Sequence, residues 1–168
     1  QTCALPISID AGQIAMISTD GSVNLQQSFI QTNGGVGRGG TIFLTANQDV
    51  AVFNTNVLAN GGTDGGQVVI VSGGRDVNLT QSIVQTNGST GRGGTILISG
   101  ANQTLISGTE INAIGSSQGG IIKIGYDALN KNIPFSSFTS IDEGTTLNTS
   151  QANTVNDSLA GGIGRAHV

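Results

Sequence analysis

Apolar and polar residues alternate in short runs along most of the chain, and no segment keeps the 3.6-residue spacing of an amphipathic helix. Side chains of an extended strand point alternately to opposite faces, so such runs predict strands with one buried face. The clearest examples follow a glycine, as in "GTIFLTA" (40–46) and "GTILISG" (94–100). The pattern therefore predicts an all-β protein built from short strands.

The strands recur with a fixed period. Two coils form a unit of 54 residues, since "QTNGGVGRGGTI" (31–42) returns as "QTNGSTGRGGTI" (85–96). The strand-opening glycines follow one another at spacings of 28, 26, 28 and 26 residues: Gly12, Gly40, Gly66, Gly94 and Gly120. Each coil holds three extended pieces separated by polar turns. We expect a right-handed parallel β-helix (β-solenoid) with three strands per coil and about six coils of 26–28 residues.

Alternation also assigns the two faces of each first strand. One register is apolar in every coil and is expected to face the core: Ile14, Met16, Ile42, Leu44, Val68, Ile70, Ile96, Ile98, Ile122 and Ile124. The other register ends in Lys123, and because lysine is rarely buried without a partner, this register is expected to face outward. Its large apolar members are Phe43, Val69 and Leu97. We expect this row either to contact a partner or to be partly covered by another segment.

An asparagine precedes a glycine after the third strand of three coils, at Asn33, Asn60 and Asn87. Asn and Gly both tolerate left-handed backbone angles, so we expect a sharp corner here. Equivalent asparagines stacked along the coils can also hydrogen-bond as an amide ladder. We therefore interpret these residues as structural.

A second ladder is expected two residues before the strand-opening glycines. Its members are Arg38, Asp64, Arg92 and Gln118. Stacking places Asp64 between two arginines, and opposite charges on neighbouring strands are mildly stabilising. The alternative, a phosphate-binding loop, needs a GxxxxGK[ST] spacing that leads into a helix, whereas "GGVGRGG" lacks the lysine and leads into a strand.

Composition excludes several classes of protein. The net charge is −4 with only six Lys and Arg, so the basic stripe of a nucleic-acid-binding protein is absent. No apolar run approaches the ~18 residues of a membrane span. The sole cysteine and histidine, Cys3 and His167, lie in segments that break the repeat pattern. We expect a single solenoid domain over 8–162, a fragment of a repeat region, and non-native sequencing-adapter ends at 1–7 and 163–168.

The repeat is interrupted once. The segment "YDALNKNIPF" (126–135) adds about ten residues between two strands, and Pro134 does not suit a central strand. Loops on a rigid scaffold often carry recognition, so its surface-contact candidates are Tyr126, Asp127, Lys131 and Phe135. The other interpretation is a flap that covers the last coils.

No catalytic, cofactor or metal residues are predicted. Asp49 and Asp76 stack at one corner and could hold Ca²⁺, but a solvated pair of carboxylates is the expectation. A polysaccharide lyase or hydrolase with a β-helix fold needs clustered acidic residues on one face. The adjacent Asp142 and Glu143 do not supply this, because neighbouring side chains of a strand point to opposite faces. We therefore do not expect an enzyme.

The motifs "GGQVVI" (65–70) and "GGTILISG" (93–100), followed by a "DVNLTQS"-type strand and a "QTNG" corner, resemble those of filamentous haemagglutinin-like exoproteins. These are the large exported partners of two-partner secretion systems. The segment 119–153 is similar to a coil of these proteins of the form "GGxVxIGGDxxG…PxxxxTxVxxGxxIxAxA". The matching residues are Gly119, Gly120, Ile124, Gly125, Asp127, Pro134, Thr139, Ile141, Gly144 and Leu147. Tyr126 departs from this form, which has a second glycine there.

The resemblance, which covers residues 11–153, implies an adhesive stalk segment at the surface of a Gram-negative type of bacterium. It implies export through an outer-membrane two-partner transporter, filament formation and extracellular contact with a host surface, a neighbouring cell or a glycan. It supplies no catalytic residue and no cofactor. The alternative function is a carbohydrate-binding β-helix, catalytic or not, of the polysaccharide lyase or hydrolase type.

Overall fold

The structure is a computed structural model that describes residues 10–126, 132–151 and 162–165, and the regular elements in these ranges are all β-strands. The first sheet comprises β1 (Gln13–Ser18), β4 (Thr41–Ala46), β7 (Gln67–Ser72), β10 (Thr95–Gly100), β13 (Ile121–Ile124) and β16 (Gly162–Arg165). The second comprises β2 (Val23–Gln26), β5 (Val50–Phe53), β8 (Val77–Thr80), β11 (Gln103–Ser107) and β14 (Phe138–Ile141). The third comprises β3 (Phe29–Gln31), β6 (Asn56–Leu58), β9 (Ile83–Gln85), β12 (Glu110–Asn112) and β15 (Thr146–Asn148).

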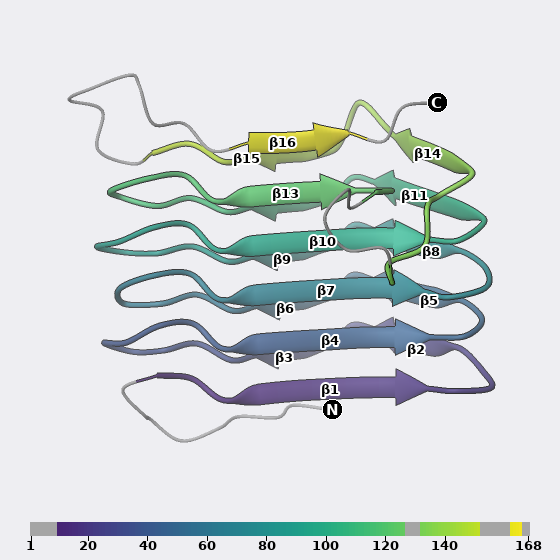
Figure 1. Cartoon of the computed structure of the whole chain (residues 1–168), viewed down its shortest axis with the longest axis horizontal. Coiled ribbons are helices and arrows are strands. Elements are labelled where there is room, and N and C mark those ends of the chain that lie inside the picture. Colours follow the sequence, from purple (N-terminus) through teal and green to yellow (C-terminus); the bar gives the residue numbers. More distant parts are fainter. Residues whose placement is uncertain (1–9, 127–131, 152–161, 166–168) are drawn as a thin grey trace.

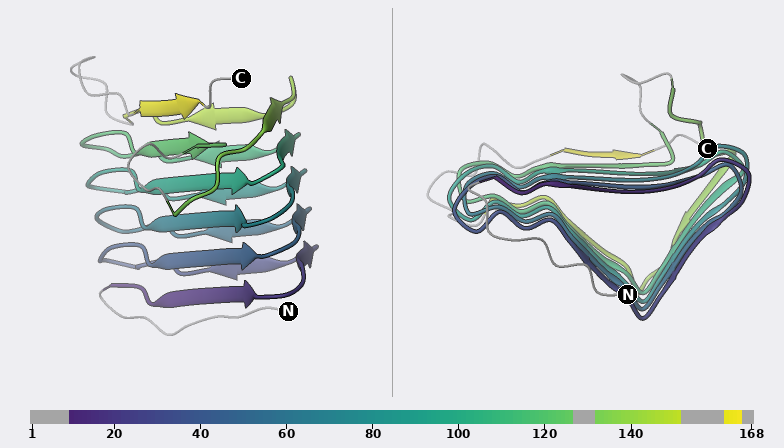
Figure 2. Two further views of the ribbon diagram at one scale, coloured as in Figure 1. Left: turned by 45° about the vertical axis from the view of Figure 1, so that its right-hand side comes forward. Right: turned by 90° about the horizontal axis from the view of Figure 1, so that it is seen from below.

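The three sheets form a parallel β-solenoid. Each strand pairs with its equivalent in the next coil, as Ile42 does with Val68 and Val68 with Ile96. In Figure 1 the chain runs rightward along β1, returns behind it through β2 and β3, and rises to β4, which is right-handed winding. Seen along the axis, the coils superimpose on a triangular outline with one drawn-out corner (Figure 2). The predicted fold class is confirmed.

The number of coils differs slightly from the expectation of about six. Four coils, β1 to β12, follow the regular period, and a fifth, β13 to β15, contains the long connection. β16 adds one strand to the first sheet by pairing with β13. Part of the segment 163–168, interpreted above as a non-native end, thus lies in a strand, and that interpretation stays a prediction. Residues 1–7 and 166–168 lie outside the described residues.

The inward register of the strands forms one continuous apolar core. Its fully covered members include Ile42 and Leu44 on β4, Ile70 on β7 and Ile96 on β10. Ile14 and Met16 pack on the same core from the first coil and stay partly exposed. Burial of each such side chain contributes about 1.5–3 kcal/mol, so the stacked aliphatic rows are a main source of stability.

Each coil has three corners. The first precedes the second-sheet strand, the second precedes the third-sheet strand, and the third leads to the next coil. Left-handed backbone angles occur at the second corner, where φ is 48° at Gln27, 46° at Asn54, 49° at Gln81 and 55° at Gly108. The expectation of left-handed angles at Asn33, Asn60 and Asn87 on the third corner is wrong. The third corner is a longer loop, so it turns without them.

The third corner instead needs glycine because two backbone arms approach closely there. The N–H of Gly94 donates to the carbonyl of Thr86 at 2.6 Å across this corner. A Cβ at Gly94 would lie 2.0 Å from the carbonyl oxygen of Gly66 and 2.8 Å from Cβ of Thr86. The "GG" that precedes β4, β7, β10 and β13 therefore reflects close contact across the corner and between coils.

We expect Gly94→Ala to destabilise the solenoid by about 2 kcal/mol or more, because the added methyl group meets backbone that cannot move independently. The measurement is the guanidinium denaturation midpoint followed by circular dichroism. Gly35→Ala is the matched control, since nothing lies within 4 Å of a Cβ at that position. Equal midpoints for the two variants would contradict the packing argument.

Candidate functional site: corner ladders and a covered outer face

The asparagines of the third corner form a ladder along the solenoid axis. The backbone N–H of Asn60 donates to Oδ1 of Asn33 at 2.9 Å, and that of Asn87 donates to Oδ1 of Asn60 at 2.7 Å. The N–H of Ile114 continues the series to Oδ1 of Asn87 at 2.8 Å. The expected ladder thus exists, but it joins side chains to backbone N–H groups rather than amide to amide. Each asparagine thereby satisfies a backbone donor of the next coil.

The charged ladder on the other arm of the third corner contains one ion pair and two backbone contacts. Nε of Arg38 lies 3.6 Å from Oδ2 of Asp64, and their side chains are 71% and 37% exposed, so the pair is worth a few tenths of a kcal/mol. Oδ1 of Asp64 accepts the backbone N–H of Arg92 at 2.9 Å. Sequence reasoning missed Asp10, which accepts the N–H of Arg38 at 2.8 Å. The order along the axis is therefore acidic, basic, acidic, basic, and then Gln118, which bridges to Arg92.

A ladder of hydroxyl groups, also missed from the sequence, lines the second corner. Its members lie 27 residues apart: Ser28, Thr55, Ser82 and Thr109. The N–H of Thr55 donates to Oγ of Ser82 at 3.2 Å, and that hydroxyl donates to the carbonyl of Thr80 at 2.8 Å. Thr55, Ser82 and Thr109 are buried, so these hydroxyl groups satisfy backbone groups that water does not reach. Their regular 27-residue spacing is the feature of the sequence from which this ladder could have been predicted.

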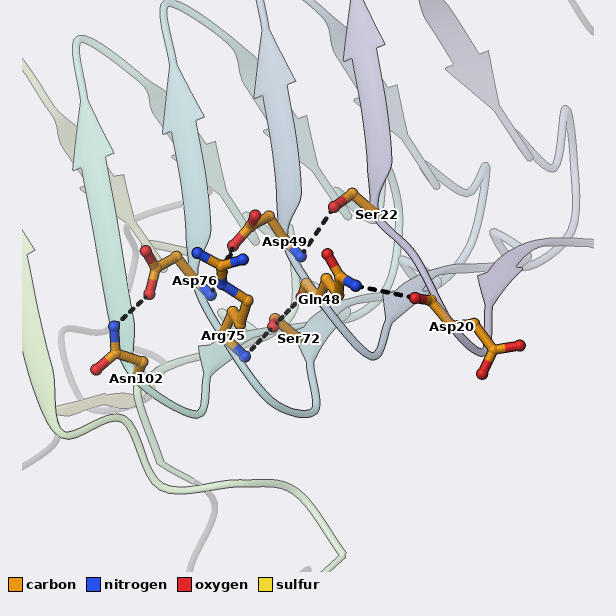
Figure 3. Close-up of polar contacts among 8 residues, drawn as sticks. All are labelled: Asp20, Ser22, Gln48, Asp49, Ser72, Arg75, Asp76 and Asn102. Atoms are coloured by element: carbon orange, nitrogen blue, oxygen red, sulfur yellow. Dashed lines mark hydrogen bonds and ion pairs between the residues drawn. The ribbon is translucent and has the colours of Figure 1, made fainter.

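The first corner holds the two stacked aspartates considered for Ca²⁺ (Figure 3). Oδ1 of Asp49 lies 3.6 Å from Nε of Arg75 and 3.3 Å from the N–H of Asp76. Oδ1 of Asp76 accepts Nδ2–H of Asn102 at 2.8 Å, and the N–H of Asp49 donates to Oγ of Ser22 at 3.2 Å. Protein donors thus engage both carboxylates. Among the described residues, no three acidic, histidine or cysteine side chains gather as a metal site.

The inserted segment lies against the outer face of the first sheet. We call residues 132–137, which comprise the described end of this segment and the two residues before β14, the strap; it is the green trace that crosses this face in Figure 1. Oγ–H of Ser99 donates to the carbonyl of Pro134 at 2.6 Å, and the N–H of Ser136 donates to the carbonyl of Gly125 at 2.9 Å. Ile133 packs on the outer-face cluster formed by Val69, Val71 and Leu97. Of the two interpretations of the insertion, this arrangement fits the covering flap.

The outward apolar row is therefore not a free surface. Val69 and Leu97 do lie on the outer face, in a cluster separate from the core, but they are only 7% and 5% exposed. Phe43 packs against this cluster and stays partly exposed. Of the two alternatives for this row, the structure shows the covered one for Val69 and Leu97, because the strap returns over strands of earlier coils. No strand pattern signals that return.

Two of the other contact candidates, Tyr126 and Phe135, lie at or near the strap. Tyr126 and Phe135 stack with their ring centroids 4.5 Å apart, and Phe135 is 63% exposed. Asp127 and Lys131 lie outside the described residues. A contact role for these four residues stays a prediction.

Among the acidic residues that the structure describes, Asp142 has the most hydrogen-bond donors around it. The hydroxyl group of Ser107 and the N–H of Gly108, the latter at 3.0 Å, lower the pKa of Asp142, with further help from Thr145 and the N–H of Gly144. Partial desolvation of the carboxyl group opposes this lowering of the pKa. The carboxylate form thus anchors the turn before β15 to the second corner of the coil below.

We expect Ile133→Ser to destabilise the fold by about 1 kcal/mol or more, because it removes apolar cover from Val69, Val71 and Leu97. It should also increase light scattering, since the uncovered row becomes available to a second molecule. Val36→Ser is the control, because Val36 is 71% exposed. A denaturation midpoint and scattering like those of the control would show that the strap contributes no cover.

We expect Asp142→Asn to weaken the pH dependence of stability in acid. A carboxyl group with a lowered pKa in the folded state stabilises the fold above its unfolded value, about 3.9, and loses that contribution as pH falls through the folded pKa. Denaturation midpoints at pH 7 and pH 3 test this. Glu143→Gln removes the neighbouring exposed carboxylate and should keep the wild-type acid loss. Identical acid behaviour of both variants would refute the role of Asp142.

The part of the chain that the structure describes contains no helix long and apolar enough to cross a membrane. No protein-family model, curated protein or solved structure matches the chain. The solenoid fold is therefore established by the structure itself.

Proposed function

We propose that the chain is a structural, adhesive stalk segment of a secreted bacterial surface exoprotein. The observation that supports it is the in-register stacking of equivalent strands through all three sheets. The main contacts of such a solenoid join neighbouring coils. It can therefore lengthen by adding coils without changing the contacts of the existing ones. Such a rod suits the role of holding a surface away from a cell.

The charged ladder supports a two-coil unit of growth. Asp10 and Asp64 are 54 residues apart, as are Arg38 and Arg92. Each aspartate accepts the backbone N–H of the arginine in the next coil. Repetition by 54 residues preserves the alternation of charge, whereas repetition by a single coil places like charges next to each other.

Export, location and adhesion rest on the resemblance to filamentous haemagglutinin-like exoproteins. Under this proposal an outer-membrane two-partner transporter exports the chain unfolded, and the coils stack outside the cell. The ligand is a host surface, a neighbouring cell or a glycan. The strap and the exposed ring of Phe135 are the recognition candidates among the described residues, because they interrupt an otherwise uniform surface.

The second candidate function is a carbohydrate-binding or carbohydrate-cleaving β-helix. Parallel β-helices offer long faces to polysaccharides, but cleavage needs a positioned acid and base. The carboxylates of Asp49, Asp76 and Asp142 sit at corners and hold backbone or side-chain donors. These contacts favour the stalk over the enzyme.

We expect that duplicating residues 40–93 produces a folded protein about 10 Å longer, at roughly 4.8 Å per coil. The insertion keeps the order of acidic and basic residues and all neighbours of the strap. Small-angle X-ray scattering measures the maximum dimension, and guanidinium denaturation measures stability. An unfolded product, or an unchanged dimension, would contradict growth by repetition.

The matched control duplicates residues 40–65 alone, which stacks a second Asp64 on the first. This protein should lengthen by about 5 Å and unfold at a lower guanidinium concentration than the 54-residue duplication. Asp64→Asn in one copy should restore part of the loss, because the amide keeps the acceptor oxygen and removes the charge.

Incubation with neutral and acidic polysaccharides separates the two candidate functions. Affinity gel electrophoresis measures retention, and new reducing ends or unsaturated uronic acids measure cleavage. Under the stalk proposal, some polysaccharides slow the migration of the protein in the gel, but the protein cleaves none of them. Shortened products that depend on the folded chain would overturn the stalk proposal.

A further inference from the structure

Three peptide bonds in the third corner belong to a reactive class: Asn33–Gly34, Asn60–Gly61 and Asn87–Gly88. In an Asn–Gly sequence the glycine nitrogen can attack the side-chain carbonyl carbon of asparagine, because no glycine side chain hinders it. Ring closure forms a new C–N bond and expels ammonia. Water then opens the resulting succinimide to aspartate or to isoaspartate. The reaction therefore needs only solvent.

At Asn60 the stacked coils hold every group that this reaction uses. Oδ1 accepts the N–H of Asn87 at 2.7 Å, and Nδ2–H donates to Oε1 of Gln85 at 3.3 Å. The attacking nitrogen belongs to Gly61, whose N–H donates to the carbonyl of Asn87 at 2.8 Å. Gly61 is also buried. Ring closure requires loss of this proton and rotation of the side chain, so these bonds must first break.

The other two sites repeat the arrangement. The N–H of Gly34 donates to the carbonyl of Asn60 at 2.9 Å, and that of Gly88 donates to the carbonyl of Ile114 at 2.8 Å. Oδ1 of Asn33 and Oδ1 of Asn87 accept backbone N–H groups of the next coil, as described above. Both glycines are buried. In each case the partner comes from the following coil, so coil stacking itself blocks the reaction.

We infer that Asn33, Asn60 and Asn87 are latent deamidation sites that the solenoid closes, and that modification proceeds through opened coils. An aspartate product keeps an acceptor oxygen and adds a negative charge to the stack. An isoaspartate product adds one atom to the backbone and shifts the corner out of register. The unstacked chain is therefore the vulnerable state, and damage in that state opposes later stacking. This inference does not depend on the proposed function.

The experiment compares folded and guanidinium-unfolded chain at mildly alkaline pH, with site-resolved peptide mass spectrometry. We expect all three sites to react in the unfolded chain and at least about tenfold more slowly in the folded chain, since reaction requires local opening. Asn47, which precedes glutamine, is the internal control for general asparagine loss. Equal rates in folded and unfolded chain would overturn the inference.

A second experiment tests whether deamidation proceeds through opened coils. Gly94→Ala, which loosens the third corner near Asn87, should accelerate deamidation of Asn87 in the folded protein and leave the unfolded rate unchanged. If this variant does not fold, wild-type chain in graded sub-denaturing guanidinium replaces it, and the rates at Asn60 and Asn87 should rise with denaturant. Rates that stay constant while stability falls would overturn the opening route.

Discussion

The stacking of each coil on the next, in strict register, is the interaction on which the rest of the molecule depends. Parallel pairing satisfies the strand backbone groups, and it also brings equivalent side chains together. The aliphatic rows inside and the polar ladders at the corners are both consequences of that register. A shift by one residue would exchange the core face for the outer face of a strand.

The corners depend on hydrogen bonds from backbone N–H groups to side chains. Some backbone N–H groups at each corner lie outside the hydrogen-bond ladders of the sheets. Side chains of the neighbouring coil accept hydrogen bonds from them. Asparagine, hydroxyl and aspartate side chains do this at the third, second and first corners, as Asn33, Ser82 and Asp49 illustrate. By our inference, the asparagine contacts at the third corner also keep the Asn–Gly bonds unreactive.

Among the described residues, the strap departs from the nearest-neighbour organisation of the coils. It follows β13 in the sequence and covers residues of β7 and β10. The strap therefore links the fifth coil to earlier coils. A repeat protein without such a link can open coil by coil. The strap thus couples the stability of several coils, and it removes from solvent an apolar row that would otherwise invite association.

The repeat by itself determined the fold class, the inward register and the positions of the Asn and Arg–Asp ladders, because identical spacing forces equivalent residues into one stack. It also contained the hydroxyl ladder and Asp10, which went unrecognised. Only the tertiary structure decided which corner takes left-handed angles, that the Asn ladder bonds to backbone N–H groups, and that Val69 and Leu97 are covered. Those features depend on how loops pack in space, and a period along the chain carries no information about where a non-repeating segment returns.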